Sequence, residues 1–477
     1  MGEHPLRWWA LAVTVTAVLV DMVDNQIVTV ALPTIQRRLG TGEASLQWIS
    51  AGYALGFALT LITGGRLGDR YGRKRLFVLG MTGFTAASLL TGLASDVGVL
   101  IAARVAQGVG SGLMVPQVLS FIQAEFDEDE RPKAMAYYSA AFPVGGLAGP
   151  LLGGVLTQTN LLGSGWRAIF LVNLPIGVLA LVGALLAMPN RPPVARQRIE
   201  AGGLALLTAG LFAIFFPLVQ GRELGWPWWS LGLMAAALPL FGLLAYQQRA
   251  HARRGGDPLI PSELLRYRSL VASQAVIFGV NAAAGVFFVL TLHLQSGLGY
   301  SPLAAALAFQ PATVGIVVGN VLAVRMAPRI GRVFTTVGIA VLLVSLGAIA
   351  ALVVWLDAAL SAWALLGPSV GFGLGMGAAL NSLISMSMSQ IRPEQAGAVS
   401  GVVSTTVQLA TATGIALSGT VFFSRLTNGY PAATAETAAV SVGLLVVALM
   451  LTATLPRVRP DEPSVVENGT TTGVSTQ

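Results

Sequence analysis

The 477-residue sequence contains no cysteine and only three histidines, and charged residues make up just 10% of it. The absence of cysteine excludes disulfide bonds and thiolate metal sites, and three histidines are too few for us to expect a metal cluster. No stretch matches the phosphate-binding loop GxxxxGK[ST], so ATP is not expected as the energy source. We also find no nucleophile–base constellation. The sequence predicts neither an enzyme nor a protein with a bound cofactor.

Apolar residues, in contrast, are abundant: they make up 54% of the chain, and the mean hydropathy is +0.73. Soluble domains carry about 25% charged residues. Apolar runs of about 20 residues recur along the chain, each long enough to cross a hydrocarbon core as a helix. We therefore predict an all-α polytopic membrane protein with fourteen spans. They are expected near 8–32, 45–64, 76–95, 97–123, 134–156, 168–188, 200–219, 227–248, 269–294, 302–326, 333–354, 360–388, 396–423 and 434–454.

Positive charge is distributed unevenly between the loops. If both termini are cytoplasmic, 22 of the 28 Lys and Arg residues fall in cytoplasmic segments, five fall outside, and Arg104 lies within the membrane. An excess of Lys and Arg in cytoplasmic loops is the positive-inside pattern. We attribute the net charge of +7 to this topology and not to nucleic-acid binding. The prediction is a multi-pass protein of the cell inner (plasma) membrane, with both termini cytoplasmic.

Two loops of the chain resemble one another. GGRLGDRYGRKR (64–75) and AVRMAPRIGR (323–332) superpose with Gly72 on Gly331, an offset of 259 residues that also relates the first and ninth spans. Parallel repeats of this kind are typical of secondary transporters, with a substrate site between the halves near mid-membrane. The predicted domains are an N-terminal six-helix bundle, two linking spans with a cytoplasmic loop, a C-terminal six-helix bundle, and a disordered cytoplasmic tail, at 1–190, 191–268, 269–455 and 456–477 respectively.

Several motifs resemble those of a known family. The loop at 65–74 looks like the signature loop of the major facilitator superfamily, GGLAGPLLGG (145–154) is similar to its antiporter motif, and RVAQGVGSG (104–112) resembles its fourth-helix motif. Three further stretches resemble its fourteen-span drug:proton antiporter branch, a multidrug efflux type. They are QWISAGYAL (47–55), GWRAIFLVNLPIG (165–177) and LQSGLGYSPLAAALAFQP (294–311). The resemblance covers roughly 8–454 and implies the major facilitator fold: two six-helix bundles plus two extra linking spans.

Two acids stand within the first span. Asp21 and Asp24 lie on one side of a helix, about 60° apart. Counted back from Pro33, the acid of the family's first-helix motif falls on Asp24, whereas Asp21 is additional. Acids inside spans usually mark ion or substrate pathways. We predict proton coupling at Asp24, Asp21 or both; the alternatives are an acid held permanently by helix partners and an acid near a water-filled vestibule. Arg104 on the fourth span lies at a depth similar to that of Asp24, so the two can pair, for coupling or only for structure.

The resemblance also implies roles for two groups of residues. The signature loop is expected to act as a gating loop that latches the two halves together; the alternative is a topology signal only. Its residues are Gly65, Asp69, Arg70, Gly72, Arg73 and Lys74.

The antiporter motif is expected to act as a hinge, because small residues let helices approach closely and a proline can bend a helix. Plain close packing explains the same residues equally well. The residues of this motif are Gly145, Gly149, Pro150, Gly153 and Gly154.

Polar residues elsewhere in the spans are weaker candidates for the lining of a substrate cavity. They are Gln26, Tyr53, Asn281, Asn381 and Gln408. Interhelical hydrogen bonds are the alternative for such residues. At Gln26 the sequence departs from the family's first-helix motif, which has Thr there.

The function predicted from these features is proton-coupled export of small amphipathic drugs or toxic compounds by alternating access. The proton gradient supplies the energy, and no cofactor is needed. The expected partners are lipophilic substrates, cationic ones included, together with protons and the bilayer, and the expected state is a monomer. Two alternatives remain open: a dedicated exporter of a single metabolite or antibiotic, and a membrane sensor or scaffold that does not transport.

Overall fold

The computed structural model of the chain is a bundle of long helices, and it describes most of the sequence. The described residues are 6–127, 129–159, 164–191, 201–254, 264–388 and 396–455. Within them, thirteen helices are long and apolar enough to cross a membrane, or fourteen when the bent α2 counts as one span. The all-α, multi-pass fold expected from the sequence is confirmed. The predicted tail at 456–477 lies outside the described residues.

The spans follow the predicted order closely. Those of the first half are α1 (Arg7–Leu39), α2 (Glu43–Tyr71), α3 (Arg73–Leu93), α4 (Val97–Glu125), α5 (Arg131–Thr159), and a sixth made of a 3₁₀ turn (Gly165–Arg167), α6 (Ala168–Leu171) and α7 (Asn173–Ala187). Those that follow are α8 (Ala201–Gln220), α9 (Trp228–Arg253), α10 (Arg268–Ala283) with α11 (Val286–Leu292) and a π-helical turn (His293–Gly297), α12 (Pro302–Ile330), α13 (Arg332–Leu356), α14 (Ala362–Met388), α15 (Ala396–Arg425) and α16 (Tyr430–Leu451).

The largest differences in boundary are at the first two spans, which are longer than their apolar runs; α2 was expected to end near 64 and continues to Tyr71. We expected the first span to end near 32, but α1 continues through Pro33 to Leu39. Gly40 ends it with a left-handed backbone (φ 60°) and an amide that bonds back to the carbonyl of Gln36. A glycine in this conformation is a common helix stop, because it lacks the Cβ that would strain other residues.

The helices form two bundles with the same internal packing. In the first, α2 and α3 both pack against α4; in the second, α12 and α13 both pack against α14. The turns that join these pairs are also equivalent: Gly72 and Gly331 both have positive φ, and their amides donate to the carbonyls of Gly68 and Ala327. These two acceptors are also 259 residues apart. The repeat inferred from the loops is therefore present in the backbone, although the structure does not test the predicted domain boundaries.

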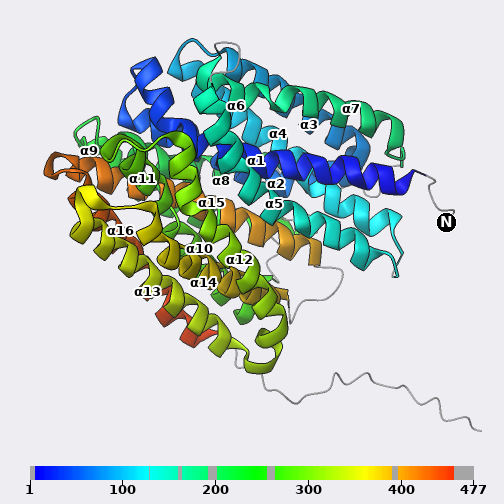
Figure 1. The fold of residues 1–477 in the computed structure, drawn as a ribbon. Coiled ribbons are helices and arrows are strands. Elements are labelled where there is room, and N and C mark those ends of the chain that lie inside the picture. The colour runs from blue at the N-terminus through cyan, green and yellow to red at the C-terminus, as the bar shows by residue number, and fades with distance from the viewer. Residues whose placement is uncertain are drawn as a thin grey trace, which may run out of the picture.

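The two bundles meet along two helix pairs, α2 with α15 and α5 with α12. We call the end at which α1 begins and α2 turns into α3 the basic end, because Arg7, Arg73 and Lys74 lie there. Figure 1 shows the bundles close together at the other end, called here the opposite end, and diverging toward the basic end. At the opposite end the amide of Gln295 donates to the carbonyl of Val30 at 2.8 Å.

The linking pair α8 and α9 fastens the opposite end. Leu211 and Phe215 of α8 share an apolar cluster with Ala51 of α2 and Ala412 of α15. In the turn after α8, Arg222 pairs with Glu43 at the start of α2 and also lies over a ring of α15. The linking spans thus contact both bundles at the end where these are closed.

Candidate functional site: the buried acids of α1

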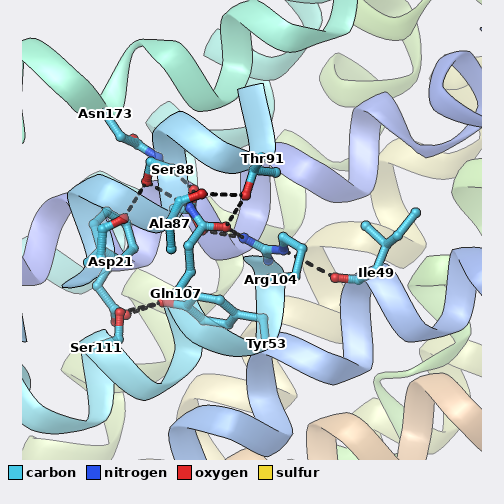
Figure 2. A network of polar contacts seen from close by, with 12 residues as sticks. Asp21, Ile49, Tyr53, Ala87, Ser88, Thr91, Arg104, Gln107, Ser111 and Asn173 are labelled. Carbon is cyan, nitrogen blue, oxygen red and sulfur yellow. Dashed lines mark hydrogen bonds and ion pairs between the residues drawn. The ribbon is translucent and has the colours of Figure 1, made fainter. Parts of the chain in front are cut away.

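Both acids of α1 lie inside the first bundle and are completely buried, as is Arg104 of α4. Ionised groups are costly to bury unless they are paired or hydrogen-bonded. The surroundings of these three side chains therefore decide what the site can do. Figure 2 shows the polar network that contains them.

Asp24 is surrounded by donors. Arg104 donates from Nη1 to Oδ2 at 2.5 Å, while Gln107 and Asn173 donate to Oδ1 at 3.2 and 2.6 Å. Arg104 is itself fixed by the carbonyl of Ile49, which accepts from Nε at 3.1 Å. Both carboxylate oxygens are bonded and a cation balances the charge. The Asp24–Arg104 ion pair that the similar depths suggested is present.

A second row of side chains supports this pair. Gln107 donates to the hydroxyl of Ser88 at 2.8 Å, and the Gln107 side-chain oxygen accepts from Arg104 at 3.1 Å and from Thr91 at 3.4 Å. Ser88 and Thr91 lie on α3, so the network joins α1, α3, α4 and α7. Side chains that bond to one another across four helices hold the guanidinium in one orientation.

Asp21 has very different surroundings. The hydroxyl of Tyr53 donates to its Oδ1, and Ser111 lies 2.8 Å from that hydroxyl oxygen. Because Tyr53 has one hydroxyl hydrogen, Ser111 must donate to it. The other oxygen, Oδ2, is buried without a hydrogen-bond partner among the described residues. Within the same part of the chain no cation forms an ion pair with Asp21.

Tyr53 joins the two acid sites. Its hydroxyl reaches Asp21, and the guanidinium of Arg104 lies 4.4 Å from its ring centroid. Figure 2 shows the hydroxyl end of Tyr53 toward Asp21 and Ser111 and its ring extending toward Arg104. The position depends on Gly108 of α4, where a Cβ would lie 2.1 Å from the carbonyl oxygen of Tyr53. The glycine motif on α4 thus brings α2 close enough for Tyr53 to contact both acid sites.

The glycines of the antiporter motif occupy two faces of α5. Gly145, Gly149 and Gly153 pack on α1; a Cβ at Gly149 would lie 2.7 Å from that of Gln26. Gly154 instead packs on the other bundle, where a Cβ would meet the Cα of Leu303 at 2.6 Å. Pro150 lies inside the helix. One face therefore sets the α1–α5 spacing, and the other is part of the contact between bundles.

The residues of the predicted gating loop lie at the basic end. Asp69 is 3.6 Å from Arg73, which donates to the carbonyl of Ser120 on α4 at 2.7 Å. Lys74 donates to the carbonyls of Leu185 and Met188 at the end of α7, at 2.7 and 2.8 Å. These contacts are all within the first bundle. They show how the loop is anchored, and its gating role stays a prediction.

The predicted cavity residues have different surroundings, and their role in a cavity stays a prediction. Tyr53 belongs to the buried acid network, and Asn281 donates to the carbonyl of Ile277 in its own helix at 2.9 Å. Gln26 is exposed, Asn381 is half-buried, and Gln408 is buried. Sequence reasoning found Arg104 but missed the two amide partners of Asp24, Gln107 and Asn173, and the hydroxyl of Ser88 that supports Gln107. Gln107 and Asn173 do lie in stretches that resemble family motifs, but Ser88 lies in none.

Comparison with known proteins supports the family resemblance. Residues 14–415 match the model of the Major Facilitator Superfamily. One relative, described as a probable actinorhodin transporter of Streptomyces coelicolor, is 41% identical over 88% of this chain and 73% of its own. Another, a puromycin resistance protein of Streptomyces alboniger, is 35% identical over 88% of this chain and 82% of its own.

The chain belongs to the Major Facilitator Superfamily. A solved structure of a bacterial homolog of the human lysosomal transporter Spinster, in an inward-facing conformation, superposes with a TM-score of 0.67. It covers 95% of this chain and 98% of that protein at 18% identity, which shows the shared fold. Because the superfamily consists of transporters, the expectation that this chain is not an enzyme is also confirmed.

Proposed function

We propose that this transporter exports small amphipathic drugs, antibiotics among them, in exchange for protons. The similarity to antibiotic exporters and resistance proteins supports drug export as the activity. The observation that carries the proton-coupled mechanism is the buried network of Asp21, Asp24 and Arg104 on α1 and α4. Ionisable residues in the interior of a membrane bundle are costly and usually mark an ion or substrate pathway.

Alternating access is the proposed cycle. The structure has its two bundles close together at the opposite end and diverging at the basic end. We assign the basic end to the cytoplasm of the cell inner membrane, with both termini there, because the Lys and Arg residues concentrate in the loops of that end. The state described is then open inward, ready to take up a substrate. Its lipophilic substrates, cationic ones included, enter between the bundles.

The gating residues fit this cycle. They lie at the basic end, where the first bundle must approach the second when the transporter opens outward, and are Gly65, Asp69, Arg70, Gly72, Arg73 and Lys74. We propose that they latch that outward-open state. The motif on α5, with Gly154 in contact with α12, is proposed as the point about which the bundles tilt.

The test uses inside-out membrane vesicles that contain the parent protein, energised to acidify their interior. Ethidium is the probe, and its accumulation is followed by fluorescence. We expect uptake that stops when a protonophore collapses the pH gradient. Vesicles with the same amount of Arg104→Leu protein are the matched control, because this change removes the cation from the network. Uptake that continues unchanged after the protonophore would reject proton coupling.

A dedicated exporter of one antibiotic is the second candidate. It is favoured by the fact that each of the two relatives compared above carries the name of a single antibiotic. Competition separates the two functions: a broad exporter has its ethidium uptake inhibited by puromycin and by several unrelated dyes. An exporter that moves puromycin and leaves ethidium outside would be of the dedicated type. If the protein bound puromycin and ethidium yet transported neither under a gradient, the sensor or scaffold alternative would stand.

A further inference from the structure

We propose that Asp21, with Tyr53 and Ser111, is the proton-binding site of this chain, and that Asp24 keeps its charge pair with Arg104. The proposal rests on the proposed function, which it makes more specific. The resemblance alone assigns both proton binding and pairing with Arg104 to Asp24, because the family's first-helix acid corresponds to Asp24 and not to Asp21. The proposal gives proton binding to Asp21 and leaves the pairing with Arg104 to Asp24. Three structural observations lead to it.

The first observation is the balance of charge. The titratable groups that act on Asp21 are Tyr53 from α2, Arg104 from α4, Tyr138 from α5 and Asp24 from its own helix. Two carboxyl groups therefore share one guanidinium, and all three side chains are buried. With both acids ionised the cluster carries one uncompensated negative charge, which is costly to bury. Protonation of one acid makes the cluster neutral, so one acid is expected to bind a proton.

The second observation decides which acid this is. The ionised form of Asp24 is stabilised by the guanidinium and by two amide donors, and a proton on it would disrupt a bond of 2.5 Å to Arg104. Asp21 has one donor, the hydroxyl of Tyr53, and an oxygen with no partner among the described residues. Hydrogen bonds and nearby cations favour the ionised form, whereas burial without them favours the protonated form. The proton therefore binds at Asp21.

The third observation is a route from the proton to the bundle interface. Tyr53 contacts Asp21 through its hydroxyl and Arg104 through its ring, and it lies on α2. On the same helix, Ala51 and Ala54 belong to one apolar cluster with Ala412 of α15, and α2 packs against α15 of the other bundle. When the carboxyl group loses its proton, the carboxylate attracts the hydroxyl of Tyr53 more strongly. That change acts directly on the helix that contacts the second bundle.

The proton balance of the cycle is simple. Asp21 gains one proton from the aqueous phase at the opposite end and releases it at the basic end, with no bond made or broken other than its O–H bond. Asp24 and Arg104 keep a net charge of zero throughout. Asp24, the acid of the family motif, then positions α4 against α1, and Asp21 carries the proton.

Infrared difference spectroscopy tests the proposal without any substrate. The purified parent protein in lipid nanodiscs is titrated with acid, and the C=O stretch of buried protonated carboxyl groups is recorded. We expect a band that titrates in the parent and is lost in Asp21→Asn. In Asp24→Asn the band should remain but appear only at lower pH, because Asp21 is then the only acid near Arg104 and its ionised form is compensated. Each variant must elute as a single species on gel filtration. A band that is lost only in Asp24→Asn, or no titrating buried band in the parent, would overturn the proposal.

A milder variant protects the test against misfolding. Tyr53→Phe removes the hydroxyl that bonds to Asp21 and leaves the ring beside Arg104. We expect the same band at a higher frequency, because a carboxyl group with one hydrogen bond fewer has a stiffer C=O bond, and Asp24→Asn should leave the frequency unchanged. A band that Tyr53→Phe does not move contradicts the proposed site. Because these measurements involve no transport, failure of the vesicle assay would reject the export function and leave the proton site standing.

Discussion

The Asp24–Arg104 pair gives a prediction whose magnitude follows from its burial. Both side chains are fully buried and joined at 2.5 Å. Removing one partner of such a pair leaves an uncompensated charge and costs about 3–5 kcal/mol, whereas replacing both by apolar residues costs far less. We therefore expect Arg104→Leu and Asp24→Leu each to lower the free energy of unfolding by about 3–5 kcal/mol. The double variant should lose much less than the sum, with a coupling energy of about 3 kcal/mol.

The assay is a double-mutant cycle measured by reversible denaturant unfolding in detergent micelles. The matched control is the pair of Arg425 and Glu436, which is also within hydrogen-bond distance, at 2.9 Å, but has side chains that are 56% and 42% exposed. Exposed pairs contribute about 0–1 kcal/mol, so the control cycle should show coupling within that range. If the losses at Arg104 and Asp24 add up with no coupling, the two groups do not compensate one another in the folded protein, and the charge-balance argument fails.

Three further predictions concern the packing of α5 on α1 and the contacts at the two ends of the protein. Gly149→Ala places a Cβ 2.7 Å from that of Gln26 and should lower the free energy of unfolding by about 1–3 kcal/mol. Gly83→Ala is the control, because a Cβ there has nothing within 4 Å, and it should leave the free energy of unfolding unchanged or raise it. Chemical unfolding compares the two variants. Arg222→Leu removes the pair with Glu43 and should widen the opposite end, seen as a longer distance between spin labels on α2 and α15; an unchanged distance would mean that the linking turn does not fasten that end. Lys74→Met should lower the unfolding temperature, because two carbonyls at the end of α7 lose their donor, and a variant as stable as the parent would show that this contact contributes nothing.

The elements of this fold were predictable because a membrane imposes simple rules on a sequence. A helix of fixed rise must cross a core of fixed thickness, so the apolar runs alone placed the spans, with the largest errors at the ends of the first two. The repeat around Gly72 and Gly331 indicated two equivalent bundles. Depth along a helix also suggested that Arg104 reaches Asp24. These inferences need only distances along one helix at a time.

The surroundings of individual side chains depend on how the helices are rotated and packed, which the sequence patterns hardly show. Gln26 and Tyr53 are both polar residues of spans, but one is exposed and the other is buried against Asp21. Lys74 belongs to a loop motif, yet it bonds to the end of α7, a contact made only when the bundle is assembled. The difference between the two acids is of the same kind, because it is set by partners on α2, α4 and α7.

The most direct test of the account measures proton movement that is driven by the substrate. Proteoliposomes with the purified protein and a trapped pH-sensitive dye receive an outward gradient of ethidium and no pH gradient. The account predicts proton movement opposite to ethidium in the parent and in Asp24→Asn protein that retains binding, with none in Asp21→Asn. Ethidium efflux from the parent without any change in internal pH would contradict proton-coupled export itself.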